Sequence, residues 1–184
     1  MSKKILILNG SPRPKGNTAV LIDSFVKGAV ASGNSVTRFD LEKMDIHPCL
    51  GCLSGGKDPK SPCVQKDAMD EIYPVFQEAE VVVFACPMYF WSFTAQLKAC
   101  VDRLFAVMES DLQSSSGKEC ILLMPAEEDS EKNFAPVVSY YQTLAENLGW
   151  KDVGMILAGG VMEVGDISGK PVLLEAEALG RSVV

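Results

Sequence analysis

The residues with the clearest chemistry form one short polar loop near the amino terminus. An apolar run over residues 5–8 precedes the loop, and a helix-patterned segment begins at its end. Free backbone N–H groups at the start of a helix bind anions, and the helix dipole adds roughly 0.3–1 kcal/mol for one charge. We therefore predict a phosphate site. The loop residues expected around the phosphate are Ser11, Arg13, Gly16, Asn17 and Thr18.

The spacing of the glycines narrows the kind of phosphate. A Walker A loop requires Gly-Lys-Ser/Thr, whereas this chain has Gly16-Asn17-Thr18. The dinucleotide fingerprint requires three glycines, and only Gly10 and Gly16 are present here. These differences favour a single phosphate monoester. The alternative is an ordinary strand-to-helix turn in which Ser and Asn side chains cap the helix.

A second loop carries large amphipathic and aromatic side chains directly after another apolar strand. It reads Pro87, Met88, Tyr89, Phe90 and Trp91. Tyr and Trp offer a flat apolar face and one polar atom, so the loop suits a planar hydrophobic ring. The alternative is that these side chains only cover the end of the sheet. A phosphate site and a ring platform at one sheet edge indicate a mononucleotide, and among mononucleotides FMN.

A third loop, after a strand that ends at Pro125, is acidic. Its carboxylates at residues 127–129 precede a predicted helix, and a helix amino terminus favours acidic side chains for its own stability. We therefore expect only backbone contacts to the ligand from this loop, made by Pro125 and Ala126.

Strand and helix patterns alternate along the chain, which predicts a parallel sheet with right-handed crossovers. Five strands fit a flavodoxin-like, three-layer, doubly wound α/β fold of order 2-1-3-4-5, with residues 1–184 as a single domain. In such folds ligands lie beyond the carboxyl ends of the strands, so the three loops are expected to converge there. The predicted strands are Lys4–Leu8, Ser35–Asp40, Val81–Cys86, Glu119–Pro125 and Val153–Leu157, and the predicted helices are Asn17–Ser32, Asp67–Glu78, Thr94–Met108, Ser130–Leu148 and Lys170–Ser182.

Composition excludes several classes of function. The 184 residues are 47% hydrophobic, which is typical of a well-packed globular core, and carry a net charge of −7, which argues against a nucleic-acid partner. No segment approaches the roughly 18 apolar residues of a membrane span, and a cytoplasmic location is expected. Six cysteines are then expected as thiols rather than disulfides, with Cys86, Cys100 and Cys120 as small core residues.

Together these motifs resemble the flavodoxin-like NAD(P)H-dependent FMN reductase family, near its iron–sulfur flavoprotein branch. The resemblance implies FMN, with Ser11, Arg13, Asn17 and Thr18 at its phosphate and residues 87–91 at its ring. It also implies NAD(P)H as electron donor and a homodimer or homotetramer. The residues that carry it are Gly10-Ser11-Pro12-Arg13, Gly16-Asn17-Thr18, Cys49-Leu50-Gly51-Cys52, Cys86 to Ser92, Ala95-Gln96-Leu97-Lys98, Asp102-Arg103 and Leu148-Gly149-Trp150.

The chain departs from the iron–sulfur branch in its long segment over residues 41–66. That branch has four cluster cysteines, whereas this segment has Cys49, Cys52 and Cys63, with glycine near the third position. We expect no iron–sulfur cluster; the cysteines remain thiols or a redox-sensitive pair. Zinc or an incomplete cluster, with His47 or Asp58 as a fourth ligand, is the alternative. The segment is expected to fold over the flavin of its own or a neighbouring subunit.

The predicted function is an FMN-dependent NAD(P)H oxidoreductase that reduces a small-molecule acceptor such as a flavin, a quinone or a nitro compound. The chain offers no triad-like grouping, so the chemistry belongs to the flavin. Lys98, Asp102 and Arg103 are interpreted as a charge pattern at the surface or at a dimer interface, with a structural role as the alternative. The alternatives are an electron-transfer flavoprotein that serves a protein partner and a thiol-based redox-sensing module.

Overall fold

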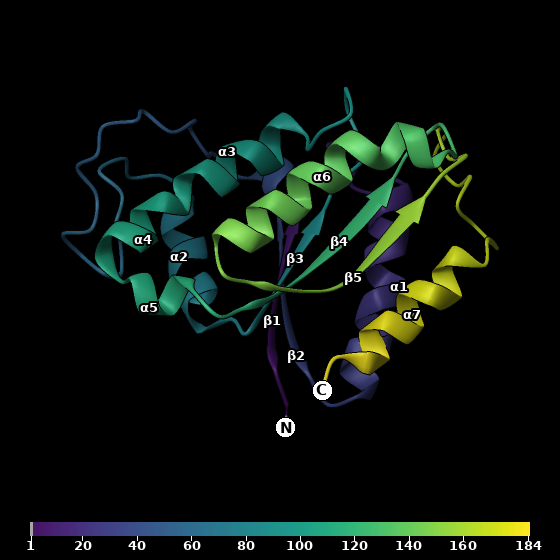
Figure 1. The fold of residues 1–184 in the computed structure, drawn as a ribbon, viewed down its shortest axis with the longest axis horizontal. Coiled ribbons are helices and arrows are strands. Elements are labelled where there is room, and N and C mark those ends of the chain that lie inside the picture. The colour runs from purple at the N-terminus through teal and green to yellow at the C-terminus, as the bar shows by residue number, and fades with distance from the viewer. Residues whose placement is uncertain (1) are drawn as a thin grey trace.

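A parallel sheet of five strands forms the centre of the computed structural model, which describes residues 2–184 (Figure 1). Its order, β2-β1-β3-β4-β5, confirms the predicted flavodoxin-like order. The strands are β1 (Lys4–Asn9), β2 (Ser35–Asp40), β3 (Val81–Ala85), β4 (Glu119–Pro125) and β5 (Lys151–Ala158). The helices are α1 (Asn17–Ala31), the 3₁₀ turn η1 (Leu41–Lys43), α2 (Met69–Glu78), α3 (Ala95–Arg103), α4 (Phe105–Ser110), α5 (Leu112–Ser115), α6 (Glu131–Asn147) and α7 (Val172–Ser182).

The central strands are buried on both faces because helices cover the sheet on either side. In β1, Leu6 and Leu8 point into one core, and Ile5 and Ile7 point into the other. This alternation follows from the two-residue period of a strand, and it explains why β1 is apolar at consecutive positions. The sheet therefore separates two hydrophobic cores.

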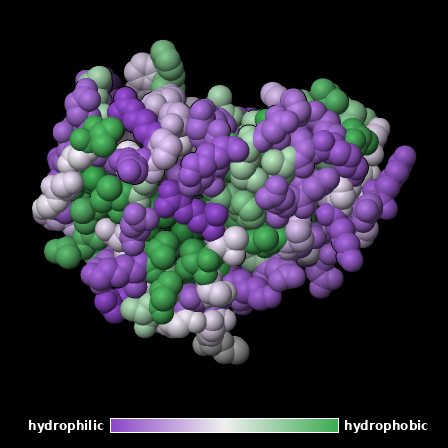
Figure 2. Space-filling model, turned by 180° about the vertical axis from the view of Figure 1, so that it is seen from behind, coloured by the Kyte–Doolittle hydropathy of each residue, from purple (hydrophilic) through white to green (hydrophobic). Residues whose placement is uncertain are grey.

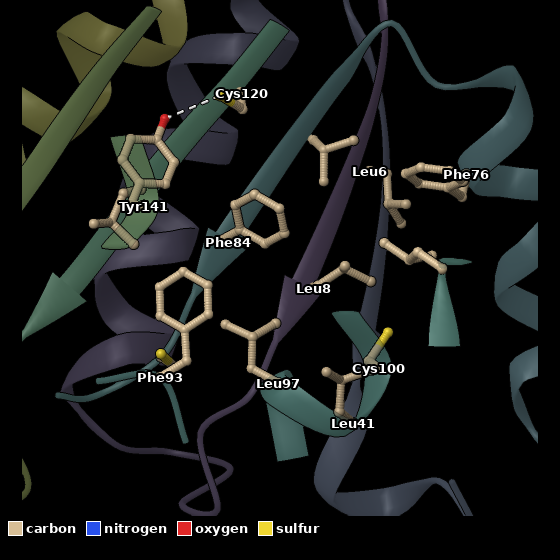
Figure 3. Close-up of a cluster of buried hydrophobic side chains, with 14 of the residues drawn as sticks. Leu6, Leu8, Leu41, Phe76, Phe84, Phe93, Leu97, Cys100, Cys120 and Tyr141 are labelled. Carbon is tan, nitrogen blue, oxygen red and sulfur yellow. Dashed lines mark hydrogen bonds between the residues drawn. The ribbon is translucent and has the colours of Figure 1, made fainter. Parts of the chain in front are cut away.

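The larger core lies between the sheet and helices α2, α3, α4 and α6 (Figure 3). Phe84 of β3 is at its centre, stacked on the indole of Trp150 with ring centroids 6.1 Å apart. Tyr141 of α6 donates its hydroxyl hydrogen bond to the sulfur of Cys120 at 3.3 Å. The three cysteines expected in the core, Cys86, Cys100 and Cys120, are all fully buried.

Helices α1 and α7 lie side by side over the other face of the sheet (Figure 1). Glycine at two positions permits this close approach. A Cβ atom on Gly28 would collide with the carbonyl oxygen of Glu177, and one on Gly180 would collide with the carbonyl oxygen of Phe25. This pairing fixes the amino-terminal end of α1 relative to the loop that precedes α7.

The predicted single helix over Thr94–Met108 is wrong, because two helices, α3 and α4, meet at Leu104. The carbonyl oxygen of Arg103 accepts a hydrogen bond from the hydroxyl of Tyr73, and the N–H of Val107 bonds instead to Leu104. A buried tertiary contact therefore interrupts the helical ladder. Helix α5 was also not predicted, and α2, α7 and β5 begin within two residues of their predicted starts.

The face opposite to that of Figure 1 is mostly hydrophilic, with apolar side chains gathered in smaller areas between the polar ones (Figure 2). Within residues 2–184, no helix combines the length and the apolar character that crossing a bilayer would require.

Candidate functional site

A cleft of about 230 Å³ opens at the carboxyl edge of the sheet, where the three loops that follow β1, β3 and β4 converge. Ten of the twelve residues predicted for cofactor binding line it. The two that do not are Phe90 and Trp91. The cleft-lining predicted residues are Ser11, Arg13, Gly16, Asn17, Thr18, Pro87, Met88, Tyr89, Pro125 and Ala126.

The start of α1 presents unpartnered donors on the cleft wall. Gly16 is the N-cap of this helix and makes no side-chain cap. The backbone N–H groups of Asn17 and Thr18, and the hydroxyl of Thr18, have no hydrogen-bond partner among residues 2–184. Unpaired N–H groups at a helix amino terminus are suited to an anion, because they are not used in the helix and the dipole favours negative charge. This end of the cleft therefore fits a phosphate.

Several side chains that were predicted to contact the phosphate form hydrogen bonds within the protein and fix the shape of the loop. The hydroxyl of Ser11 accepts a hydrogen bond from the N–H of Arg13 at 3.2 Å. The Asn17 amide donates to the carbonyl oxygen of Glu163 at 2.9 Å and accepts from the N–H of Gly165 at 3.2 Å. Arg13 is exposed, and its guanidinium reaches the carbonyl oxygen of Met162 at 2.9 Å. The free donors are therefore backbone N–H groups of the loop, together with the guanidinium N–H groups of Arg13 that Met162 does not use.

The segment between β5 and α7 forms part of the cleft wall and was missed by sequence reasoning. Val161 and Met162 from this segment line the cleft, as does Glu127 from the acidic loop. The segment is held in place by Asn17 and by Asp166, whose carboxylate accepts from the N–H groups of Met162 and Glu163. Its glycines, at positions 159, 160, 165 and 169, are the only sequence signal that could have marked it as a structured loop.

The loop over residues 87–91, the ring loop, divides into two parts. Met88 and Tyr89 lie on the cleft wall. Their N–H groups are already used, by the carbonyl oxygens of Pro125 at 3.0 Å and of Ser92 at 3.2 Å. Phe90 and Trp91 do not line the cleft and are exposed, by 93% and 54% respectively. Of the backbone donors expected from Met88 to Phe90, only that of Phe90 has no partner within residues 2–184.

Pro125 and Ala126 also use their backbone groups to join the loops. The N–H of Ala126 donates to Ala158, and the carbonyl oxygen of Ala126 accepts from Val161, each at 2.9 Å. Together with the bond from Met88 to Pro125, these contacts hold the loops after β3, β4 and β5 in one rigid edge. The cleft is therefore preformed by backbone hydrogen bonds.

Thr94 joins the polar loop over residues 10–16, the phosphate loop, to the ring loop. Its buried hydroxyl donates to the carbonyl oxygen of Gly10 at 2.8 Å and caps α3 by accepting from the N–H of Leu97. A Cβ atom on Gly10 would lie 2.6 Å from that hydroxyl, so only glycine fits there. Nearby, burial raises the pKa of the Cys86 thiol to about 12, so Cys86 stays protonated and is not a nucleophile.

The segment over residues 41–66, the cysteine segment, lies apart from the cleft in this chain. None of residues 41–66 lines the cleft. Cys49, Cys52 and Cys63 line a separate cavity of about 40 Å³, together with residues of α3 and α4. No residue of this segment reaches the cleft wall of its own chain, and coverage of the flavin, in its own or a neighbouring subunit, stays a prediction. Within residues 2–184, no three His, Cys, Asp or Glu side chains converge as a metal-ligand set.

A cluster held by four thiolates does not fit this segment. The third cluster position corresponds to Gly55 or Gly56. The N–H of Gly55 donates to the Glu109 carboxylate at 3.1 Å, and a Cβ atom on Gly55 would collide with that carboxylate. A Cβ atom on Gly56 would lie 2.7 Å from the backbone oxygen of Glu109. A side chain at Gly56 would therefore require the backbone of α4 to shift, whereas one at Gly55 would require only the end of the Glu109 side chain to move.

Arg103 is buried and holds the cysteine segment to the domain, which agrees with the structural alternative and not with a surface position. Its guanidinium is 1% exposed and forms a double hydrogen bond with Asp67, at 2.7 and 3.0 Å. It also donates to the carbonyl oxygen of His47 at 2.8 Å. Burial alone would raise the pKa of Asp67, but the hydrogen bonds from Arg103 and from two backbone N–H groups lower it from 3.8 to about 2. Lys98 and Asp102 do form an exposed ion pair, at 2.7 Å.

Comparison with known proteins gives the same family that the sequence motifs resemble. A family model described as NADPH-dependent FMN reductase matches residues 3–124. An iron–sulfur flavoprotein of Archaeoglobus fulgidus is 31% identical over 177 residues, which cover 95% of this chain and 76% of that protein. A second iron–sulfur flavoprotein, from Methanocaldococcus jannaschii, is 33% identical over 100 residues, 54% of this chain and 51% of that protein, so the match spans about half of that relative.

A solved structure supports the fold. The NAD(P)H:quinone oxidoreductase from Methanothermobacter marburgensis superposes with a TM-score of 0.74 at 22% identity, covering 98% of this chain and 96% of that one. At this identity the match shows the flavodoxin-like architecture. The family model extends over β1 to β4 and thus includes the phosphate loop and the ring loop. The chain belongs to the NADPH-dependent FMN reductase family of FMN-dependent oxidoreductases.

Proposed function

We propose that the cleft binds FMN with its phosphate at the start of α1 and its ring against Met88 and Tyr89. The protein then passes electrons from NAD(P)H to a small planar acceptor such as a flavin, a quinone or a nitro compound. One observation carries this proposal: a single cleft joins the unpartnered N–H groups of Asn17 and Thr18 to the side chains of the ring loop. The donor set suits a doubly charged monoester, and the apolar wall suits a ring.

When bound, FMN supplies hydride transfer between nicotinamide and acceptor. The protein's contribution is binding and orientation. The N–H groups of Asn17 and Thr18, the Thr18 hydroxyl and the Arg13 guanidinium would hold the phosphate through charge-assisted hydrogen bonds. The unpartnered N–H of Phe90 is the donor available to a carbonyl oxygen or ring nitrogen at the rim. No step requires an acid or base from the chain, which has one histidine, His47, on the remote cysteine segment.

We also propose a homodimer or homotetramer. Exposed apolar side chains on α4 and α5 support this assembly, since Phe105 is 45% exposed and Leu112 is 63% exposed. Exposed apolar side chains are removed from water when two copies pack together, which stabilises the assembly. Sedimentation velocity of the FMN-loaded protein measures the number of copies directly.

Anaerobic rapid mixing with NADPH and NADH tests the proposed activity. We expect the visible absorbance of the oxidised flavin to disappear within seconds with at least one nicotinamide, and to return when a quinone is added. Dithionite serves as the control, because it reduces bound flavin without a nicotinamide site. Reduction by dithionite but by neither nicotinamide would contradict the reductase proposal.

A further inference from the structure

The tip of the ring loop has a backbone conformation that its sequence does not favour. Tyr89 and Ser92 exchange both backbone hydrogen bonds, at 3.2 and 3.0 Å, and so close a two-residue turn. The residues between them, Phe90 and Trp91, have φ angles of +47° and +58°. Turns with two positive φ angles normally use Asn-Gly or Asp-Gly, because left-handed backbone is unfavourable for a residue with a larger side chain. The aromatic side chains are therefore present at a cost to stability.

The fold does not use these side chains in its core. Phe90 is 93% exposed and Trp91 is 54% exposed. In Figure 1 the segment between β3 and α3 rises beyond the carboxyl edge of the sheet. The Trp91 indole is nevertheless fixed, since its Nε1–H donates to the side chain of Asn133 at 2.7 Å. The rings of Phe90 and Trp91 lie 6.4 Å apart at 73° and form an aromatic corner.

This corner adjoins the cleft and an acidic rim. Tyr89 and Met88, just before it, lie on the cleft wall, and Met88 is bonded to Pro125. Trp91 is bonded to Asn133. The exposed residues between these two anchors carry four carboxylates, Glu127, Glu128, Asp129 and Glu131, and one ammonium group, Lys132. A ligand that contacts the corner therefore lies near net negative charge.

We infer that the side chains of Phe90 and Trp91 form the platform for the electron acceptor and do not hold the FMN ring, to which Phe90 offers only its backbone N–H. These side chains favour a neutral planar aromatic acceptor over an anionic one. This inference rests on the proposed function. It assigns Met88 and Tyr89 to the cofactor and the next two residues to acceptor specificity. The overall reaction with a quinone is balanced: NAD(P)H and one proton from water reduce the quinone to the hydroquinone and leave NAD(P)⁺.

Phe90→Ala in the FMN-loaded protein tests the inference. We expect the dissociation constant of 2-methyl-1,4-naphthoquinone, measured from the perturbed flavin absorbance without NAD(P)H, to rise about fivefold, as expected for loss of one aromatic contact. Its KM should rise in parallel. The dissociation constant of FMN and the KM for ferricyanide, an acceptor that does not stack, should stay within twofold. Phe90→Tyr should retain quinone binding, and Leu174→Ala is the control for loss of an exposed apolar side chain away from the cleft.

A separate binding measurement tests the preference for a neutral over an anionic acceptor. A sulfonated naphthoquinone should bind the native protein more weakly than the neutral quinone, and the double variant E128Q/D129N should narrow that difference.

Three results would overturn the inference. Weaker FMN binding in Phe90→Ala would assign the ring to the cofactor. An unchanged quinone dissociation constant would leave the corner without this role. A changed sedimentation coefficient would assign the tip to a contact between copies. Because quinone binding is measured without nicotinamide, these results are distinct from failure of the reductase proposal, in which NAD(P)H does not reduce the flavin.

Discussion

Two adjacent residues, Asn17 and Thr18, supply most of the free donors of the proposed anion site. Both side chains are polar and were predicted to contact the phosphate. The side-chain amide of Asn17, however, forms its hydrogen bonds with the segment before α7. The free donors on the cleft wall are the two backbone N–H groups and the Thr18 hydroxyl. Hydrogen bonds between neutral donors and a phosphate are stronger than neutral pairs, because the acceptor is charged. Residue type indicates an anionic ligand, while the tertiary fold decides which donor atoms remain available to it.

Replacing Arg13 by alanine tests the phosphate contact at this scale. We expect FMN binding to weaken by roughly 1.5–3 kcal/mol, about 10–100-fold in dissociation constant, because one charge-assisted contact is lost. The dissociation constant of riboflavin, which has no phosphate, should change little. Lys15→Ala is the matched control: Lys15 is an exposed cation in the same loop that does not line the cleft. Equal losses in the two variants would indicate general electrostatics instead of a contact.

At the scale of elements, the cap of α3 connects the two halves of the site. Thr94 is fully buried, donates to Gly10 in the phosphate loop, and caps the helix that follows the ring loop. Gly10 is in turn bonded to Ala85 at the end of β3, at 2.8 Å. Because these bonds join the ends of β1 and β3, the spacing between phosphate and ring contacts is set by the scaffold.

Thr94→Val removes the hydroxyl while retaining the shape of the side chain. We expect the free energy of unfolding to fall by about 1–2 kcal/mol, because the cap is lost and the Gly10 carbonyl is left unpaired. FMN affinity should fall as well, since the phosphate loop is less well held. Chemical denaturation and fluorescence titration measure the two effects. Thr94→Ser keeps the hydroxyl and should remain close to the native protein; a loss as large as that of valine would contradict the account.

The elements also show what could be read from the sequence. The five strands and their order follow from apolar runs separated by helical patterns, and ten cleft residues follow from strand ends meeting at one edge. Local patterns could not show the break at Leu104, because it depends on Tyr73 reaching the carbonyl of Arg103 across the core. Val161 and Met162 carry no chemical signature, since apolar side chains in a loop become a wall only after the loop has docked on α1.

For the whole molecule, one buried ion pair ties the long segment after β2 to the helical layer. The side chains of Arg103 and Asp67 are 1% and 2% exposed, and Arg103 also holds His47 and Gln65 through their carbonyl oxygens. Removing one partner of such a pair leaves a buried charge without compensation, which typically costs 3–5 kcal/mol. The pair is therefore expected to be a main support of the cysteine segment.

Asp67→Asn tests this support through pH. The carboxylate has a pKa of about 2 when folded and near 3.8 when unfolded, so the unfolded chain takes up the proton first on acidification. About 2 kcal/mol of stability, fully present above pH 4, should be lost between pH 4 and 2. The variant should be less stable at pH 7 and lack this dependence. The control Asp102→Asn removes an exposed pair and should change the unfolding free energy by less than about 1 kcal/mol. Parallel acid profiles for native protein and Asp67→Asn would contradict the assignment.

Calorimetric titration of the apoprotein with FMN and with riboflavin tests the central claim most directly, because the two ligands share the ring and differ in the phosphate. If donors at the start of α1 hold the phosphate while Met88 and Tyr89 contact the ring, FMN should bind at least about 100-fold more tightly than riboflavin. Equal affinities, or no heat with either ligand, would contradict it.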